Sequence, residues 1–150
     1  MRKVRLVVAA AVACCLGAIP VAANAGVGIE AGGGAVVATG QSGNHLYVGT
    51  LTADVSPEGV GLVAVVWNCQ AEASPAAIST SLSECSINGH NAPATTLPGT
   101  ASATASTFVF AAGTVVQACI QGFASFPEVL LGGQLVTTAR VCQPINTANL

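Results

Sequence analysis

Short runs in which apolar and polar residues alternate recur along the chain from about residue 35 onward. The run 67–73 alternates at every position, and the runs 45–55, 101–110 and 118–126 keep the same two-residue period over much of their length. This period is typical of β-strands with one buried face, because successive side chains of a strand point to opposite sides. No stretch of the domain has a convincing helical period. The sequence therefore predicts an all-β domain.

Turn residues divide this pattern into seven expected strands. The stretch 56–59, Ser-Pro-Glu-Gly, fits a type I turn with proline at the second position and glycine at the fourth. The stretch 88–100 contains glycines and prolines throughout, so we expect a long connection without regular structure. The seven strands are expected at 35–39, 45–55, 60–73, 78–87, 101–110, 118–126 and 135–142.

Seven short strands with one tryptophan close to a cysteine are typical of a two-sheet sandwich. The only tryptophan, Trp67, lies two residues before Cys69 in an alternating run. We therefore predict a seven-stranded immunoglobulin-like sandwich. A Greek-key β-barrel would give a similar pattern and is the alternative fold.

The N-terminus has the three parts of a secretory signal peptide. Basic residues among the first five positions precede an uncharged apolar run, 6–23, that ends in small residues. We expect cleavage after Ala25, which makes residues 1–25 the signal peptide and 26–150 the secreted domain. A membrane anchor is an alternative, although glycine and proline interrupt the run and shorten it below the roughly 20 residues of a spanning helix. Lipid modification at Cys14 is a second alternative.

Cleavage at this point changes the charge balance of the chain. Arg140 is then the single basic residue against six aspartates and glutamates, which is a formal charge of −5 without any lysine. Phosphate groups are bound by lysine and arginine, so this composition excludes nucleic acid and anionic membrane as partners. We predict an extracellular protein with no membrane span after cleavage.

The cysteine content of the secreted domain indicates disulfide bonds. An even number of cysteines in a small exported domain is typical of a disulfide framework. The close cysteine spacing of common zinc sites is missing, and His45 and His90 are isolated in the sequence. We therefore expect neither a metal site nor a cofactor. The four cysteines are Cys69, Cys85, Cys119 and Cys142.

The expected strand register supports a disulfide between Cys119 and Cys142. If Cys119 faces Cys142 in an antiparallel ladder, Phe126 faces Leu135 and one face of the pair becomes continuously apolar. A slip of one residue would turn every side chain to the other face, so this agreement favours the bridge. The stretch 127–133 is then the connecting loop.

The predicted bridge between Cys69 and Cys85 rests on a similar hairpin. Cys69 and Cys85 would close a second local hairpin, formed by the runs 67–73 and 78–87. The apolar residues of the returning run change phase, so we expect a β-bulge near Ser83-Glu84 or a less direct pairing. The two crossed connectivities of the four cysteines are the alternatives.

Candidate chemistry is sparse in this sequence. Neither histidine has a carboxylate placed within a few residues to orient it, and the Gly-x-Ser-x-Gly motif of serine hydrolases is missing. The acidic residues are dispersed over turns and outward strand positions. We therefore predict a non-enzymatic protein, and a weak calcium site in the turns stays an open alternative.

Three stretches carry a resemblance to a known group of proteins. The stretches "WNCQAEA … STSLSEC", "APATTLPGTASATAS" and "QACIQGFASF … VTTARVC" resemble the small, exported, alanine-, threonine- and serine-rich two-disulfide proteins of actinobacteria. The resemblance covers roughly residues 67–142 and implies a secreted β-sandwich with two local disulfides. It transfers no active residue.

Two better-known actinobacterial families share single features with this chain. The enediyne-binding apoproteins are also acidic, lysine-poor immunoglobulin-like sandwiches, but their disulfides close much shorter loops. The subtilisin-inhibitor family has a similar first cysteine spacing, but its reactive-site segment has no match here.

These observations favour an exported non-enzymatic module for extracellular or cell-envelope interaction with an unknown partner. The alternatives are a binding protein for a small apolar ligand and a secreted serine-protease inhibitor. We expect the contact surface on the two longest loops, because loops on a rigid sandwich are common recognition sites. Packing of the leucine pair 130–131 against the core is the competing interpretation. The candidate contact residues are Leu97, Val129, Leu130 and Leu131.

Overall fold

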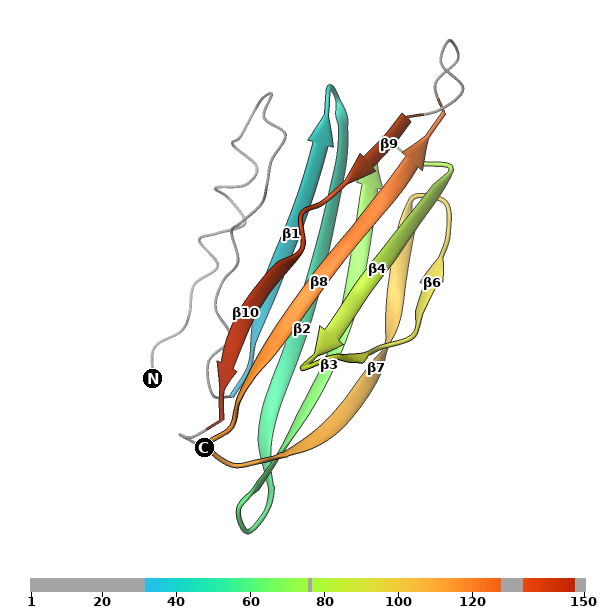
Figure 1. Ribbon diagram of the computed structural model, residues 1–150. Helices are drawn as coiled ribbons and strands as arrows, with labels where there is room; N and C mark the ends of the chain where they lie inside the picture. Colours follow the sequence, from blue (N-terminus) through green and yellow to red (C-terminus); the bar gives the residue numbers. More distant parts are fainter. Residues whose placement is uncertain (1–31, 76, 128–133, 148–150) are drawn as a thin grey trace.

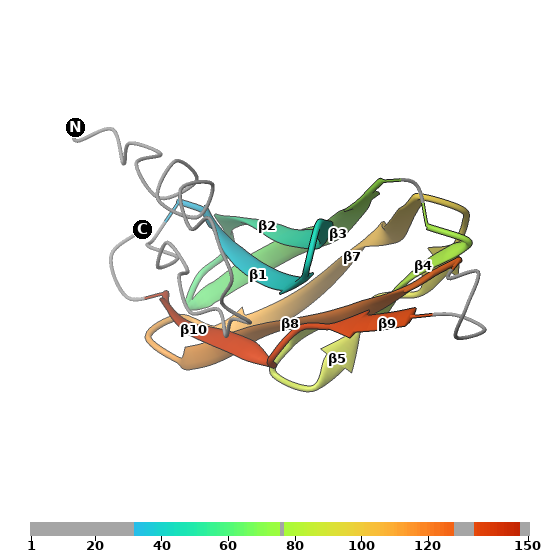
Figure 2. The same cartoon turned by 90° about the horizontal axis from the view of Figure 1, so that it is seen from above.

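The computed structural model describes residues 32–75, 77–127 and 134–147, and within them the chain forms two antiparallel β-sheets packed face to face (Figures 1 and 2). These residues contain ten strands and no helix. The all-β prediction is confirmed. The sheets do not close on each other, so the alternative of a closed barrel is wrong.

The first sheet has five strands in the order β1-β2-β3-β7-β6, and the second has the order β10-β8-β4-β5 with β9 also paired to β8. The strands of the first sheet are β1 (Gly34–Ser42), β2 (His45–Gly59), β3 (Leu62–Ser74), β7 (Thr100–Ala111) and β6 (Ala94–Thr96). Those of the second sheet are β10 (Val141–Asn146), β8 (Val115–Phe126), β4 (Ser79–Ile87), β5 (His90–Asn91) and β9 (Gln134–Thr137).

The difference between seven predicted and ten observed strands has two sources. The connection 88–100 is not irregular throughout, because it contains the short strands β5 and β6. The last predicted strand is divided into β9 and β10 by residues 138–140, which belong to no strand. Glycine and proline shorten strands in the connection but do not prevent the two- and three-residue pairings seen there.

The predicted turn at 56–59 is wrong, since these residues continue β2. Ser56 and Pro57 pair with Ala64 and Val63 of β3, and the chain reverses at residues 60–61. Gly61 has a φ of +73°, a conformation that glycine adopts without steric cost. The turn therefore forms at the glycine that can take this conformation, after the proline.

The register of β9 also differs from the prediction. Cys142 does face Cys119, but Leu135 faces Ser125 instead of Phe126. The segment 138–140 holds one residue more than the stretch of β8 opposite it. This extra residue turns Leu135 to the outer face, where it is 61% exposed, and Val136 to the core.

The core between the sheets is built from the inward positions of the long strands. Along β3, the apolar members of the alternating run are buried, as predicted. The Trp67 indole Nε1 donates a hydrogen bond of 3.1 Å to the Cys85 carbonyl of the opposite sheet. The Tyr47 hydroxyl crosses the core in the same way and donates to the Ser81 carbonyl at 2.7 Å. Burial raises the pKa of Tyr47.

Candidate functional site

The two disulfides have the predicted partners, but one of them has an unexpected structural role. Cys119–Cys142 joins β8 to β10 within the second sheet. Cys69–Cys85 joins β3 of the first sheet to β4 of the second. The hairpin expected around the latter bridge is wrong, because β4 pairs with β8. The bridge therefore fastens the two sheets together.

The irregularity expected at Ser83-Glu84 is present, although its partner strand is different. The register of β4 against β8 shifts between Leu82 and Glu84. The shift accommodates the change of apolar phase that the sequence shows along this strand. It leaves Cys85 and Ile87 buried against the first sheet.

The loop residues expected to contact a partner are only partly described. Leu97 follows β6 and is 51% exposed. Its backbone is fixed by the second sheet, because the Thr80 N–H donates to the Leu97 carbonyl at 2.9 Å. Val129, Leu130 and Leu131 lie outside the described residues.

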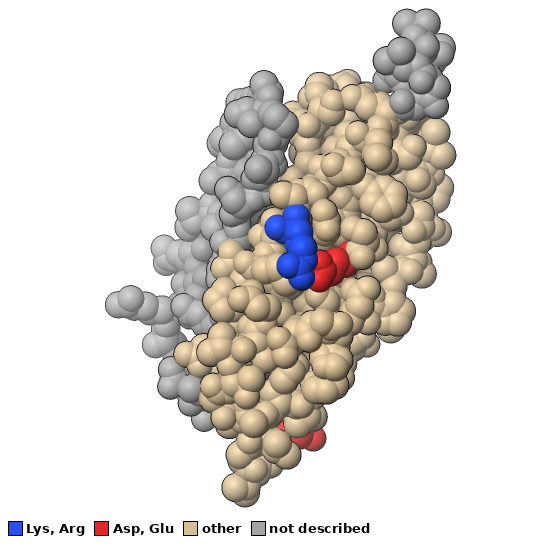
Figure 3. All heavy atoms as spheres, in the orientation of Figure 1, with Lys and Arg blue, Asp and Glu red and all other residues tan. Residues whose placement is uncertain are grey.

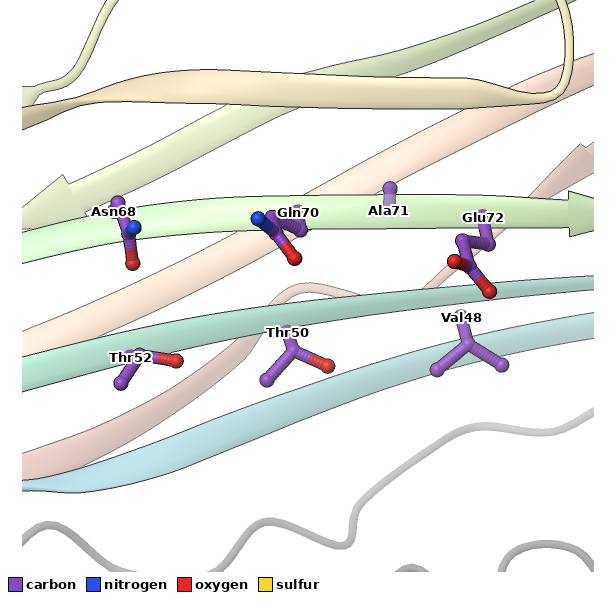
Figure 4. A pocket seen from close by; sticks show the side chains of 7 residues that line it. All are labelled: Val48, Thr50, Thr52, Asn68, Gln70, Ala71 and Glu72. Carbon is purple, nitrogen blue, oxygen red and sulfur yellow. The ribbon is translucent and has the colours of Figure 1, made fainter.

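A groove with a volume of about 430 Å³ lies on the outer face of β2 and β3. Figure 4 shows the side chains that line it in two rows, one along β2 and one along β3, with Ala71 alone pointing the other way. We call this hollow the polar groove. Its lining residues are Val48, Thr50, Thr52, Asn68, Gln70, Ala71 and Glu72.

Strand pairing explains why these side chains lie together. The antiparallel register places Thr50 opposite Gln70 and Thr52 opposite Asn68. Directly opposite residues of such a pair project to the same face, with Cβ atoms roughly 5 Å apart. The intervening positions, such as Leu51 and Cys69, are fully buried. The inward half of the alternating pattern therefore builds the core, and the outward half builds the groove.

The polar side chains of the groove have hydrogen-bonding capacity that the described residues leave unused. The side chains of Thr50, Thr52, Asn68 and Gln70 make no hydrogen bond within the described part of the chain. Hydroxyl and amide groups each offer both donors and acceptors. The groove thus presents four neutral side chains of mixed hydrogen-bonding character on a rigid pair of strands.

The groove contains one charged side chain, Glu72, and no cation. Arg140, the sole Lys or Arg of the described residues, lies between β9 and β10. It binds Glu84 of β4 through two hydrogen bonds, of which Nη2–Oε2 measures 3.0 Å. Its hydrogen bond lowers the pKa of the Glu84 carboxyl. Figure 3 shows how few charged atoms that face carries. An anionic ligand would therefore find no counter-charge in the groove.

The two histidines serve as packing residues. The His45 ring lies 4.4 Å from the Phe126 ring, and the His90 ring stacks on Phe108 at 3.7 Å. In residues 32–75, 77–127 and 134–147, no three His, Cys, Asp or Glu side chains gather in an arrangement that could hold a metal ion.

No known protein family matches the chain, and no curated protein or solved structure shows significant similarity to it. Across the described residues there is no helix with the length and apolar character needed to cross a membrane.

The polar groove was not predicted from the sequence, although its signal is present there. The outward positions of runs 45–55 and 67–73 include two threonines, an asparagine, a glutamine and a glutamate. Such residues are ordinary on an exposed strand face, so their types alone do not distinguish a binding surface. The register of β2 against β3, which brings the two rows together, supplies the missing information.

Proposed function

We propose that the two sheets form an immunoglobulin-like sandwich. The strand order supports this assignment, because β2-β3-β7-β6 follows the order of strands A, B, E and D in such domains. In the second sheet, β4 and β8 take the places of strands C and F, and the divided edge formed by β9 and β10 takes the place of G. Strands β1 and β5 are then additions at the sheet edges.

We propose further that the protein is exported. Two intramolecular disulfides are consistent with an oxidising extracellular environment. The resemblance to the actinobacterial two-disulfide proteins favours the same location. The predicted signal peptide, residues 1–25, lies outside the described residues.

The proposed function is that of a non-enzymatic module which binds a neutral polyhydroxylated polymer of the cell envelope through the polar groove. The observation that carries this proposal is the paired array of hydroxyl and amide groups that have no hydrogen-bond partner among the described residues. Sugar hydroxyl groups match such an array, since each can donate and accept. The scarcity of positive charge argues against acidic polymers.

An array of neutral, anionic and cationic oligosaccharides tests this function. We expect retention on neutral sugars and loss of at least tenfold in affinity for the variant Asn68→Ala/Gln70→Ala. Gln117→Ala is the matched control, because Gln117 is exposed on β8 in the other sheet. Binding of no neutral sugar, or binding unchanged in the double variant, would reject the proposal.

The predicted loop contact stays a second proposal for protein partners. Replacement of both Leu130 and Leu131 by serine should abolish binding to such a partner and leave the melting temperature within a few degrees. If these leucines pack against the core instead, the same variant loses several kcal/mol of stability. The alternatives of an apolar ligand between the sheets and of protease inhibition have no supporting contact among the described residues.

A further inference from the structure

One side of β7 is an open sheet edge. Strand β3 pairs along one side of β7, whereas β6 covers only residues 101–103 on the other. The last hydrogen bond on that side is donated by the Thr104 N–H to the Pro93 carbonyl at 2.9 Å. Within the described residues, no strand pairs with the stretch 105–111 on this side (Figure 1). We call this stretch the β7 edge.

The β7 edge lacks the features that normally prevent edge-to-edge pairing. Natural edges are blunted by lysine, proline, inward charges or bulges. Residues 105–111 contain no charged residue and no proline. The one irregularity of β7 lies before Ser106, at the register shift between the partners of Trp67 and Cys69. From Ser106 onward the ladder with β3 is regular.

Exposed apolar side chains accompany this edge. Phe108 and Val109 are 39% and 41% exposed, and Leu62 and Val66 of the adjacent strand are 44% and 37% exposed. The His90 ring stacks on Phe108. The backbone of β5, which carries His90, pairs with β4 and leaves the backbone of β7 open. Val109, Leu62 and Val66 lie on the outer face of the sheet and Phe108 on the inner face. Exposed apolar side chains on both sides of unpaired backbone groups favour strand addition.

Strand β1 at the opposite edge of the same sheet makes contacts with the second sheet near its C-terminal end. A Cβ atom added at Gly40 of β1 would lie 2.5 Å from the Thr137 carbonyl oxygen, so β1 and the β9 segment are in close contact. The Gln134 side chain donates a hydrogen bond to the Ser42 hydroxyl at this junction. The second sheet therefore contacts the C-terminal end of β1, whereas no such contact is made at the β7 edge by β9 within the described residues.

The absence of charge on the β7 edge favours a second copy of the chain as its partner. The acidic residues of the described chain lie elsewhere, at Asp54, Glu58, Glu72 and Glu84. The β7 edge and the neighbouring residues 62–71 of β3 carry no charge at all. Like charges placed opposite each other destabilise strand pairs, and this surface avoids that cost. It also offers no carboxylate to attract a basic partner.

We propose that two copies of this protein pair antiparallel through their β7 edges. The pairing joins two five-stranded sheets into one continuous sheet and leaves no open β7 edge. It is isologous and closes after two subunits, because the same strand is used by both. The two-fold axis of an antiparallel pair is perpendicular to the sheet, so both polar grooves lie on the same face. If the proposed function holds, the dimer is therefore bivalent for a repeating polymer.

Sedimentation equilibrium of the exported protein tests the dimer without any ligand. A single strand edge is smaller than a standard interface, so we expect a reversible dimer with a dissociation constant in the micromolar range. Val109→Lys places like charges near the two-fold axis and should raise the dissociation constant of the dimer by at least tenfold. Leu135→Lys is the control, because Leu135 is 61% exposed on β9 in the other sheet.

Hydrogen exchange supplies a measurement that needs no substitution. Amides of residues 105–111 should exchange more slowly as protein concentration rises, and those of β9 should not. A monomer at millimolar concentration, open-ended polymers, a dimer disrupted by Leu135→Lys alone, or pairing only with a different protein would each overturn the proposal. Loss of groove binding in the sugar array would leave the dimer unaffected, so the two proposals fail separately.

Discussion

Replacing Thr80 by valine should stabilise the fold. Its side chain is fully buried on β4, and Oγ1 has no hydrogen-bond partner among the described residues. Burying a hydroxyl without a partner costs roughly 1–3 kcal/mol in mutational data. Valine has nearly the same shape, so Thr80→Val removes this cost without opening a cavity. We expect the free energy of unfolding to rise by about 1 kcal/mol.

A second buried threonine provides the matched control. The Thr138 Oγ1 accepts a hydrogen bond of 3.1 Å from the Gly122 N–H, and the residue is 4% exposed. Thr138→Val leaves that N–H without its partner, so we expect a loss of about 1–3 kcal/mol. The same substitution should thus change the free energy of unfolding in opposite directions at two buried positions.

Urea unfolding at 25 °C measures both effects. The midpoint should move upward for Thr80→Val and downward for Thr138→Val, with unchanged dependence on urea concentration. A 1 kcal/mol change corresponds to about 4 °C in melting temperature for a domain of this size. If Thr80→Val destabilises the protein as much as Thr138→Val does, then Thr80 has a partner and the reasoning is wrong.

Three further changes have defined outcomes. A Cβ atom at Gly122 would overlap the Tyr47 hydroxyl group, so Gly122→Ala should cost several kcal/mol. Thermal melting measures this against Gly43→Ala, where a methyl group has space and only the φ of +59° adds a cost of roughly 1–2 kcal/mol. Replacing Cys69 and Cys85 by alanine should lower stability by about 3 kcal/mol from loop entropy alone, seen as a lower urea midpoint. Because the pKa of Glu84 is lowered in the folded state, its contribution is complete above the unfolded pKa of about 4.3 and is lost as pH falls through the folded pKa. The drop in stability between pH 7 and pH 3 should therefore be smaller in Glu84→Gln.

Local periodicity was sufficient to place most strands and their buried faces. Trp67 and Cys69 are inward, as their run predicts, and Cys119 faces Cys142 in the predicted register. These features depend on neighbouring residues or on one antiparallel pair. A period of two fixes which side chains share a face, and this information is contained in the run itself.

The partners of the strands were harder to predict, because pairing depends on distant parts of the chain. The run that ends at Ile87 has the same alternation whether it lies beside β3 or β8, so its membership of the second sheet is not visible locally. The phase of Leu135 depends on one extra residue at 138–140, where the Thr138 side chain turns inward to bind Gly122. Tertiary packing decides both cases.

The candidate groove illustrates the same limit at the level of function. The types of Thr50 and Gln70 are visible in the sequence, but their position opposite each other comes from the pairing of β2 with β3. The freedom of their side chains is also a property of the folded surface. A binding array on a sheet can therefore be recognised only after the register is known.

The binding of neutral sugars to the polar groove is tested most directly by NMR. The side-chain amide groups of Asn68 and Gln70 give separate NH₂ signals that report on the groove itself. On titration with the neutral oligosaccharide retained best on the array, these signals and the backbone amides of β2 and β3 should shift with one common dissociation constant, while those of Gln117 stay in place. Shifts confined to the second sheet or to the loop near Leu97, or no shift at saturating sugar, would contradict the account.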